Sequence, residues 1–143
     1  MFNLTFYYET IIDESLTEVW RFFQSTENLA QMTRVPKIAV LGDSNVYEGA
    51  KVHLRLNFLL LNFYWKGTIS ETVDGVYFID EGEKLPWPIR SWQHVHTFKA
   101  LSHNQTQMID RISVSSFLPS RIMTIGLTMM FSNREKYLHH YFN

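Results

Sequence analysis

One local pattern fills the middle of the sequence: apolar-rich segments of strand character, separated by turn residues, follow one another over residues 37–115. Gly, Asp and Asn interrupt these segments at positions 42–45, 74–75, 82 and 103–104, and turns favour these residues because they tolerate positive φ or bond to their own backbone. Asp74-Gly75 is the strongest hairpin signal among them. Strands joined by such short turns pair with their neighbours in sequence, so the pattern predicts one antiparallel sheet.

Two segments indicate how this sheet is covered. From Lys51 to Phe58 every second side chain is apolar and its neighbours are polar, which is typical of a strand with one buried and one wet face. Phe2–Ile12 also alternates, with Leu4, Phe6 and Tyr8 on one side. We therefore expect a further strand before the central block.

Two short helices are expected between that first strand and the central block. Ser15-Leu16-Thr17-Glu18 has the spacing of a capping box, in which the Ser hydroxyl and the Glu carboxylate each satisfy a free backbone N–H at a helix start. The apolar residues that follow at helical spacing predict a helix over roughly 16–24. Ser25 or Thr26 can cap a second helix, which must stop before Pro36.

After Phe117 the apolar period changes to that of a helix. One stripe along it carries Leu118, Ile122, Ile125 and Met129. The pattern predicts one long C-terminal helix that runs to about His140. Gly126 in its interior costs about 1 kcal/mol relative to Ala, and it leaves a dent in the helix surface. Such a dent can seat a bulky strand residue, which is the more common reason, or leave room for a ligand.

Composition limits the class of protein. With 143 residues, of which 45% are hydrophobic, the chain is long enough for one core and too short for two, so we expect a single domain over residues 1–143. Thirteen Lys and Arg against 14 Asp and Glu give a formal charge of −1, which disfavours nucleic acid as a partner. The absence of Cys excludes disulfides, thiol nucleophiles and thiolate metal sites.

The sequence also indicates a location. The most apolar segment, residues 56–65, is interrupted by Asn57 and Asn62, and the first residues do not follow the pattern of a signal peptide. We therefore expect a cytoplasmic protein without a membrane span.

Several motifs together resemble a known superfamily. They are Glu18–Phe23 followed by Glu27–Leu29, then Phe78–Glu81, then Trp92–Phe98 with its Trp-x-His-x-His-x-Phe pattern, and then Met108–Arg111. Over nearly its whole length the chain resembles the SRPBCC superfamily, which includes START lipid-transfer domains, Bet v 1-like pollen allergens and polyketide cyclases. It is most similar to the bacterial SRPBCC ligand-binding group that is sometimes fused to an NAD-dependent epimerase-like domain. The chain has no GxGxxG loop, so a dehydrogenase activity has no support.

The resemblance implies an α+β helix-grip fold. In that fold a curved, seven-stranded antiparallel sheet wraps around a long C-terminal helix, two short helices follow the first strand, and a hydrophobic cavity lies between sheet and helix. The order of elements expected above agrees with it.

The strand around Trp92–Phe98 carries the candidate chemistry. Because side chains alternate along a strand, Trp92, His94 and His96 share one face, which the aromatic residues indicate is the inner one. Asp110 in the next strand also points inward by its alternation and lies within reach of either imidazole. A buried imidazole beside a carboxylate is either a structural hydrogen bond that orients a ligand or an oriented general base. We favour the first.

Other constellations are weaker. His94-Val95-His96 has the spacing of a metal pair with Asp110 or Asp80 as third ligand, but the Glu that a cupin-like site needs is missing, so we expect no metal. Arg90 beside a short Pro-containing loop can receive a carboxylate, phosphate or carbonyl of a ligand. An ion pair from Arg90 to Asp80 or Glu81 is at least as good an explanation.

Residue direction and the resemblance together give a set of expected ligand-binding residues: Leu54, Leu56, Trp65, Phe78, Asp80, Arg90, Trp92, His94, His96, Asp110, Met123, Leu127 and Met130. We expect them to bind a hydrophobic or amphipathic small molecule, such as a lipid, isoprenoid, polyketide or aromatic metabolite, without a cofactor. The alternative is a cyclase- or dehydratase-like enzyme that uses His94 or His96 with Asp110 as acid and base. Possible partners are a second copy in a weak homodimer and, by the resemblance, an epimerase-like protein.

Overall fold

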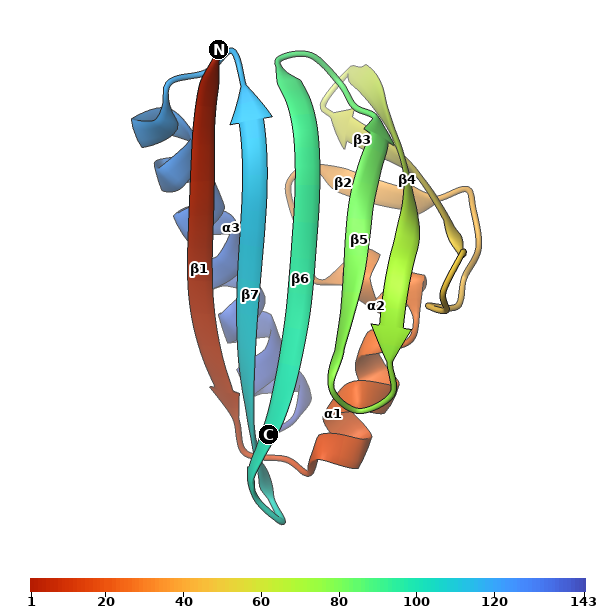
Figure 1. The fold of residues 1–143 in the computed structure, drawn as a ribbon, viewed down its shortest axis with the longest axis vertical. Helices are drawn as coiled ribbons and strands as arrows, with labels where there is room; N and C mark the ends of the chain where they lie inside the picture. Colours follow the sequence, from red (N-terminus) through yellow and green to blue (C-terminus); the bar gives the residue numbers. More distant parts are fainter.

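A computed structural model describes residues 1–143, and its elements follow the expected order (Figure 1). In chain order they are β1 (Phe2–Ile12), α1 (Leu16–Phe23), α2 (Thr26–Gln31), β2 (Lys37–Val40), β3 (Lys51–Phe58), β4 (Leu61–Val73), β5 (Tyr77–Lys84), β6 (Ile89–Ser102), β7 (Gln105–Ser116) and α3 (Ser120–Tyr141). The two short helices therefore separate the first strand from the other six, as predicted.

The strands form a single seven-stranded sheet in the order β1-β7-β6-β5-β4-β3-β2, and every neighbouring pair is antiparallel. Only the β1–β7 pairing joins strands that are distant in sequence. Because β1 pairs along its whole length with β7, this contact closes the N-terminal strand onto the hairpins. The curled sheet lies in front of α3, and α1 and α2 lie in the lower half of the view (Figure 1). The predicted antiparallel sheet with a long C-terminal helix is confirmed.

The expected capping box is formed only in part. The Ser15 hydroxyl accepts from the Glu18 backbone N–H at 3.3 Å, which caps α1 as expected. The predicted reciprocal contact, from the Ser15 N–H to the Glu18 carboxylate, is not formed. The Glu18 carboxylate pairs with Arg21 at 2.6 Å, and the Ser15 N–H donates to Glu14 instead. Ser25, rather than Thr26, caps α2 through the Asn28 N–H.

Two turns differ in how well the sequence predicts them. Gly75 lies in the β4–β5 turn with a φ of 71°, so the predicted hairpin there is confirmed. The turn between β3 and β4 consists of Leu59 and Leu60, and Leu59 itself has a φ of 57°. Neither leucine is a turn residue by chemistry. The flanking pair, Asn57 and Asn62, is joined by a side-chain hydrogen bond of 2.9 Å.

Buried apolar residues form two clusters between the sheet and the helices. The larger cluster lies around α1 and the adjoining ends of β5, β6 and β7: Ile12, Val19, Trp20, Phe22, Phe23, Met32, Val46, Ala50, Ile69, Phe78, Phe98, Met108 and Leu138. The smaller one joins α3 to β1 and β7: Phe6, Ile112, Val114, Met123 and Phe131. The α3 helix thus packs mainly against the β1 side of the sheet.

The outer side of α3 is apolar in its first half. Met123 and Phe131 face the sheet, whereas Ile122, Ile125 and Met129 are exposed. Gly126 belongs to this outer side, and a Cβ built on it meets no atom within 4 Å. The dent predicted at Gly126 therefore seats no strand residue. No helix is long and apolar enough to span a bilayer.

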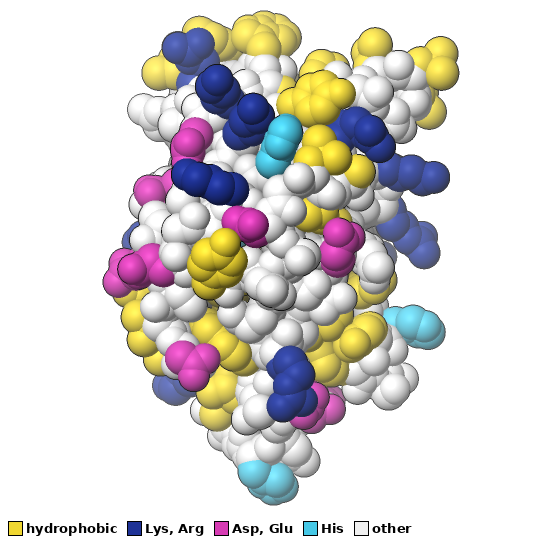
Figure 2. All heavy atoms as spheres, turned by 90° about the vertical axis from the view of Figure 1, so that its right-hand side faces the viewer, with side chains coloured by type: hydrophobic (Ala, Val, Ile, Leu, Met, Phe, Trp, Pro, Cys, Tyr) yellow, Lys and Arg dark blue, Asp and Glu magenta, His cyan; other side chains and the backbone are white.

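Charged side chains are unevenly distributed over the surface. Figure 2 shows the side of the molecule that carries β3 and β4, with Lys and Arg gathered in its upper part, directly below apolar side chains at the upper edge. Most Asp and Glu side chains on this face lie lower or toward its left margin.

Candidate functional site

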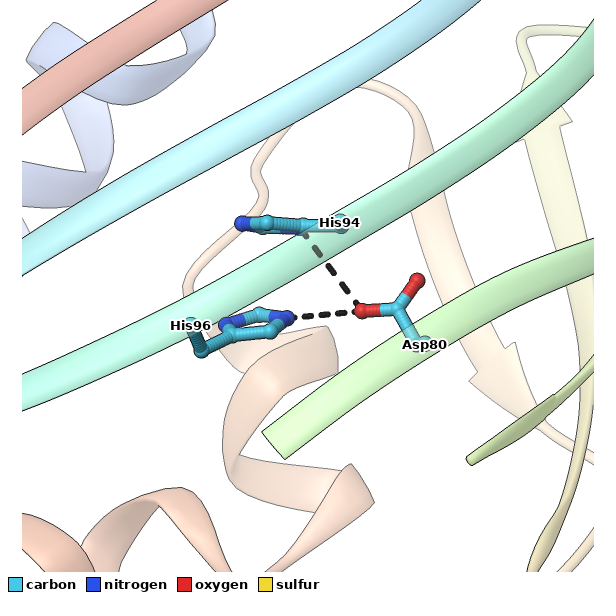
Figure 3. Close-up of side chains that lie close together, drawn as sticks. All are labelled: Asp80, His94 and His96. Carbon is cyan, nitrogen blue, oxygen red and sulfur yellow. Dashed lines mark hydrogen bonds and ion pairs between the residues drawn. The ribbon is translucent and has the colours of Figure 1, made fainter. Parts of the chain in front are cut away.

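The two histidines of β6 point into the molecule, as the aromatic residues on the same face of the strand predicted. His94 and His96 are 6% and 4% exposed, and Asp110 of β7 is 1% exposed. Strand pairing places them together, because Asp80 of β5 is opposite His94 and Asp110 is opposite His96. Figure 3 shows the Asp80 carboxylate directed at both imidazoles.

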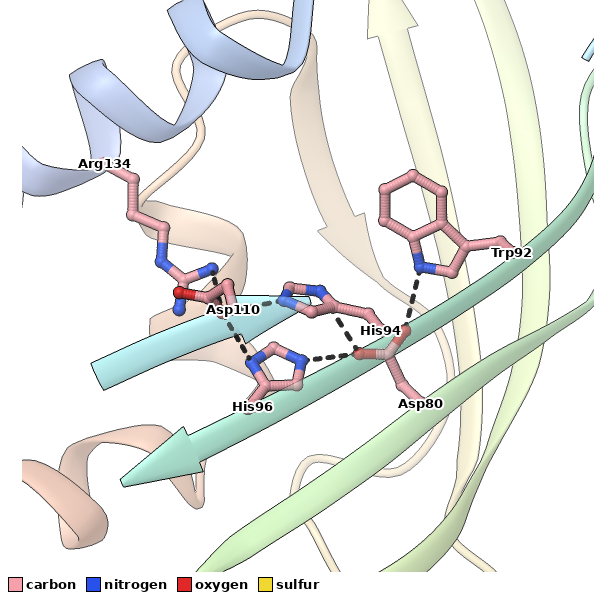
Figure 4. A network of polar contacts seen from close by, with 6 residues as sticks. All are labelled: Asp80, Trp92, His94, His96, Asp110 and Arg134. Atoms are coloured by element: carbon pink, nitrogen blue, oxygen red, sulfur yellow. Dashed lines mark hydrogen bonds and ion pairs between the residues drawn. The ribbon is translucent and has the colours of Figure 1, made fainter. Parts of the chain in front are cut away.

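Short polar contacts join these four residues to two more (Figure 4). His94 Nε2 lies 2.7 Å from Asp110 Oδ1, and His96 Nε2 lies 2.6 Å from Asp80 Oδ2. The indole N–H of Trp92 donates to Asp80 Oδ1 at 3.1 Å, and Arg134 Nη1 lies 3.6 Å from Asp110 Oδ1. Asp80, Trp92, His94, His96, Asp110 and Arg134 are called the polar network below.

Aromatic rings fix the orientation of the imidazoles. The His94 and His96 rings stack with centroids 3.6 Å apart, and Phe78 stacks on the other face of His96 at 4.1 Å. The Arg134 guanidinium lies over the rings of Phe23 and Phe131, about 5 Å from each centroid. The network is therefore held between the two apolar clusters, where its groups have little freedom to turn.

Burial and neighbouring charge set the protonation of the network. Burial, and the proximity of His94, lower the pKa of His96 to about 4. Burial alone would raise the pKa of Asp110, but Arg134 and the hydrogen bond from His94 hold it well below its ordinary value. The pKa of Asp80 is also lowered, because the hydrogen bond from His96 and the charge of His94 outweigh the effect of burial. Near neutral pH, both carboxylates are thus ionised and His96 is uncharged.

These states define the donors and acceptors. Because neither carboxylate carries a proton, His96 Nε2–H donates to Asp80 and His94 Nε2–H donates to Asp110. In neutral His96 the remaining nitrogen, Nδ1, is then an acceptor. Three buried atoms of the network have no hydrogen-bond partner within the chain: His96 Nδ1, Asp110 Oδ2 and Arg134 Nη2. Buried polar atoms without a partner are uncommon in folded proteins, and each of these three is open to a polar partner from outside the chain, such as water or a polar group of a ligand.

The network also contains a possible set of metal ligands. Asp80, His94 and His96 each offer one donor atom, and these atoms lie within 4.8 Å of one another. The His94 Nδ1 to Asp80 Oδ2 distance is 3.7 Å, whereas the His96 Nε2–H is already donated to that same oxygen. A cation would have to displace this proton, and the absence of a metal remains our prediction, to be checked by elemental analysis of the purified protein.

An apolar wall adjoins the network on the inner face of β3 and β4. Leu54 and Trp65 are opposite each other in the strand register, and Leu56 follows on the same face. All three are only partly buried and belong to neither core cluster. The Trp65 ring meets that of Trp92 edge-on at 5.1 Å, so the wall is continuous with the polar network.

The α3 helix carries two further residues of the predicted set. Leu127 and Met130 are partly buried and pack against the smaller cluster. Met130 also lines a groove of about 390 Å³ between α3 and residues 32–35. Another hollow, of about 850 Å³, lies on the opposite face of the sheet, where it is lined by polar residues such as Thr5, Gln93 and Ser113. It includes none of the charged residues of the polar network.

Three further residues of the predicted set lie away from the wall: two are in the core and one is on the surface. Phe78 and Met123 are buried inside the two core clusters. Arg90 is exposed, and its guanidinium lies over the Phe117 ring at 5.6 Å. The structure does not bring Arg90 to the network or pair it with Asp80 or Glu81, since Asp80 bonds Trp92 and His96 and Glu81 accepts from Gln93.

Sequence reasoning missed Arg134. This residue lies on the buried side of α3 with Phe131 and Leu138, and a charged residue at a position of the apolar helix stripe was the available signal. The sequence pattern indicated only an apolar role for Trp92, whereas its indole N–H donates to Asp80.

No protein-family model and no curated protein matches the sequence. Solved structures do match over nearly the whole chain. A protein from Chromobacterium violaceum has a TM-score of 0.77 at 14% identity, with 96% of each chain covered. A START superfamily protein from Mycobacterium smegmatis gives 0.75 at 10% identity, also over 96% of each chain.

Major latex-like protein 151 from Panax ginseng gives a TM-score of 0.75 at 7% identity, over 100% of this chain and 99% of that one. At such identities the likeness concerns the fold. The curled seven-stranded sheet, the two short helices and the long C-terminal helix are the helix-grip fold of START-superfamily and major latex-like proteins, and this chain has that fold, as its sequence resemblance predicted.

Proposed function

We propose that the protein binds a small amphipathic molecule between the inner face of the sheet and α3. The observation that carries this proposal is the meeting of two features at one place. The polar network holds three buried atoms without partners, on His96, Asp110 and Arg134. Through Trp92 this network meets an apolar wall that the chain itself leaves only partly covered. A ligand with an apolar body and one polar group complements both.

The apolar wall supplies the affinity in this proposal. Leu54, Leu56 and Trp65 on the sheet and Leu127 and Met130 on the helix still expose part of their side chains. Covering such surface is favourable by roughly 25 cal/mol per Å². Thioether side chains adapt to ligands of different shape, so a lipid, an isoprenoid, a polyketide or an aromatic metabolite all fit this surface.

The polar network supplies the orientation. Arg134 Nη2 can donate to a carbonyl or carboxylate oxygen, and His96 Nδ1 and Asp110 Oδ2 can accept from a hydroxyl. Both kinds of contact pair atoms that are otherwise unsatisfied in a buried place. The bound molecule therefore carries an oxygen-containing group at one end.

Native mass spectrometry of the gently purified protein tests the proposal, followed by denaturing extraction of any bound molecule. We expect an organic mass that Leu56→Asn removes, because this change makes the wall polar. The matched control is Arg55→Asn, on the exposed face of the same strand. A bare mass, with no binding when apolar ligands and their hydroxylated analogues are added, would overturn the proposal.

A second function is favoured by one observation, that each imidazole is already held by a carboxylate. The contacts are 2.7 Å for His94 with Asp110 and 2.6 Å for His96 with Asp80. This is the arrangement of an oriented general base, as in a cyclase-, dehydratase- or isomerase-like enzyme. If His94→Ala and Asp110→Asn weaken the binding of the extracted molecule while the wild-type protein never converts it, the enzymatic function fails.

We further propose, from the sequence resemblance, a single-domain protein of the cytoplasm with an epimerase-like partner. Affinity capture of the tagged chain, with sizing by light scattering, tests the partner and the monomer or weak homodimer that we expect. Capture of no epimerase-like protein would remove that partner.

A further inference from the structure

The turn between β3 and β4 presents an unusual surface. Leu59 and Leu60 are 93% and 95% exposed, and both flanking residues, Phe58 and Leu61, are exposed as well. Single exposed apolar residues are ordinary, but a contiguous exposed apolar patch indicates a binding surface. Four such residues in succession at the tip of a hairpin therefore require an explanation other than packing.

A second apolar residue projects at the same end of the molecule. Trp87, in the connection from β5 to β6, is 75% exposed. Lys84 is opposite Lys66 in the β4–β5 register, so the residues after Lys84 continue toward the start of β4 and the leucine turn. Figure 1 shows both connections at the upper end of the sheet. We call Phe58–Leu61 together with Trp87 the apolar tip.

Cations surround the apolar tip. Lys66 and Lys84 are opposite each other in β4 and β5. Arg55 of β3 is opposite Tyr64, two residues along β4 from Lys66, and Lys37 of β2 is opposite Asn57. These side chains are exposed. In Figure 2 the Lys and Arg side chains accordingly gather just below the apolar upper edge. The chain as a whole has a formal charge of −1. The excess of cations at this end therefore comes from an uneven placement of charged residues and not from a basic composition.

The acidic groups near this end are already engaged. Glu83 accepts from the Thr68 hydroxyl, and Glu81 accepts from Gln93. They lie on β5, further from the leucine turn than Lys84. Neither carboxylate forms an ion pair with the cations around the tip.

We propose that this end of the molecule docks on an anionic lipid surface, with the leucine turn inserted among the acyl chains. Apolar residues that enter the boundary of a bilayer, flanked by Lys and Arg that meet its phosphate groups, are the general pattern of a protein that lies on a membrane. A second copy of the chain fits less well, since two like cationic surfaces would face each other. The proposal goes beyond ligand binding and does not depend on it.

Co-sedimentation with vesicles tests the docking. The wild-type protein is expected to bind vesicles of phosphatidylcholine and phosphatidylglycerol in equal parts, to bind phosphatidylcholine alone at least tenfold less, and to dissociate at high salt. The double variant Leu59→Ser and Leu60→Ser is expected to lose at least tenfold in partitioning. Lys66→Glu with Lys84→Glu is expected to abolish the preference for anionic vesicles.

Matched controls come from the opposite end of the sheet. Leu101→Ser and Lys99→Glu change an exposed leucine and an exposed lysine near the β6–β7 turn, and they should leave vesicle binding unchanged. Circular dichroism checks that each variant is folded, which is expected because all these side chains are exposed. Trp87→Phe should remove any blue shift of fluorescence on docking.

Two results would overturn the proposal. One is vesicle binding that is equal on both lipid compositions or unchanged in the leucine variant. The other is a wild-type dimer in sedimentation velocity that becomes a monomer in the leucine variant, which would assign the tip to a second copy.

Discussion

The two ends of the sheet's inner face are built from similar residues and packed very differently. At the α1 end, Trp20 and Phe23 meet Phe98 edge-on with centroids 5.0 and 5.3 Å apart, and all three are buried. At the β3–β4 end, Leu56 and Trp65 point to the same inner side but keep part of their surface exposed.

The helices account for this difference. The α1 helix packs against β6 and β7, α2 packs against β2, and α3 packs against β1. The upper inner face of β3 and β4 therefore receives little cover from the helices. We therefore expect stability to be concentrated at the α1 end, while the β3–β4 end keeps uncovered surface for the proposed ligand or lipid surface. With this separation, residues at the β3–β4 end can change without loss of the packing at the α1 end.

The largest expected effect contrasts one aromatic residue from each end. Phe23→Ala removes a fully buried ring from the larger cluster and should lower the free energy of unfolding by about 4 kcal/mol. Trp65→Ala removes a partly exposed ring and should cost less than half as much, although the residue is larger. Urea unfolding of both variants measures the difference. Equal losses would show that the β3–β4 end contributes as much to stability as the α1 end.

The polar network should give the next largest effect. Asp110→Ala leaves Arg134 buried without its ion-pair partner and should cost about 3 kcal/mol in unfolding free energy. Adding Arg134→Met should recover part of this loss, since the unpaired charge is then removed as well. A double-mutant cycle from urea unfolding gives the coupling between them. No recovery in the double variant would mean that the two residues do not act as a pair.

Acidification should weaken the same region. The pKa of His96 is about 4 in the folded protein against an ordinary value of 6.5, so between these values the unfolded chain binds a proton that the folded chain excludes. Stability is then complete above pH 6.5 and falls by up to about 3 kcal/mol as the pH drops to about 4. Asp80 and Asp110, whose pKa values are lowered, add a loss of the same sign at lower pH.

His96→Gln isolates the histidine contribution. The variant should show a flatter dependence of unfolding free energy on pH between 6.5 and 4, while His103→Gln, at the exposed β6–β7 turn, serves as the control. An unchanged slope in His96→Gln would assign the acid sensitivity to other groups.

Local periodicity was sufficient to predict much of this molecule from sequence. The period of two in β6 placed His94 and His96 on the inner face, and the same rule placed Asp110 of β7 on that face, because strand alternation is a property of the backbone. The turn at Gly75 was predicted for the same reason, since its chemistry is local.

Relations between distant segments were not predictable in this way. Arg134 reaches Asp110 only because of where α3 lies against the sheet. The sequence pattern of either segment alone does not predict this position. The Leu59-Leu60 turn carries no turn chemistry and is imposed by the strands on either side. The sequence also did not show which side of α3 faces the sheet, because the first half of this helix is apolar on both faces.

The smallest expected effect concerns two glycines that share open surroundings and differ in backbone. A Cβ at Gly126 or at Gly75 meets no atom within 4 Å. Gly126 is helical, so Gly126→Ala should raise the free energy of unfolding by about 0.5–1 kcal/mol through lower entropy of the unfolded chain. Gly75 has a φ of 71°, and Gly75→Ala should therefore be destabilising by about 1 kcal/mol.

The sign of the Gly126 effect also tests the outer side of α3. Thermal melts at several protein concentrations measure both variants. A gain for Gly126→Ala that is independent of concentration supports a free helix face beside Ile122 and Ile125. A loss that grows with concentration would show that another chain approaches the glycine closely, and that the apolar outer side of the helix is covered in solution.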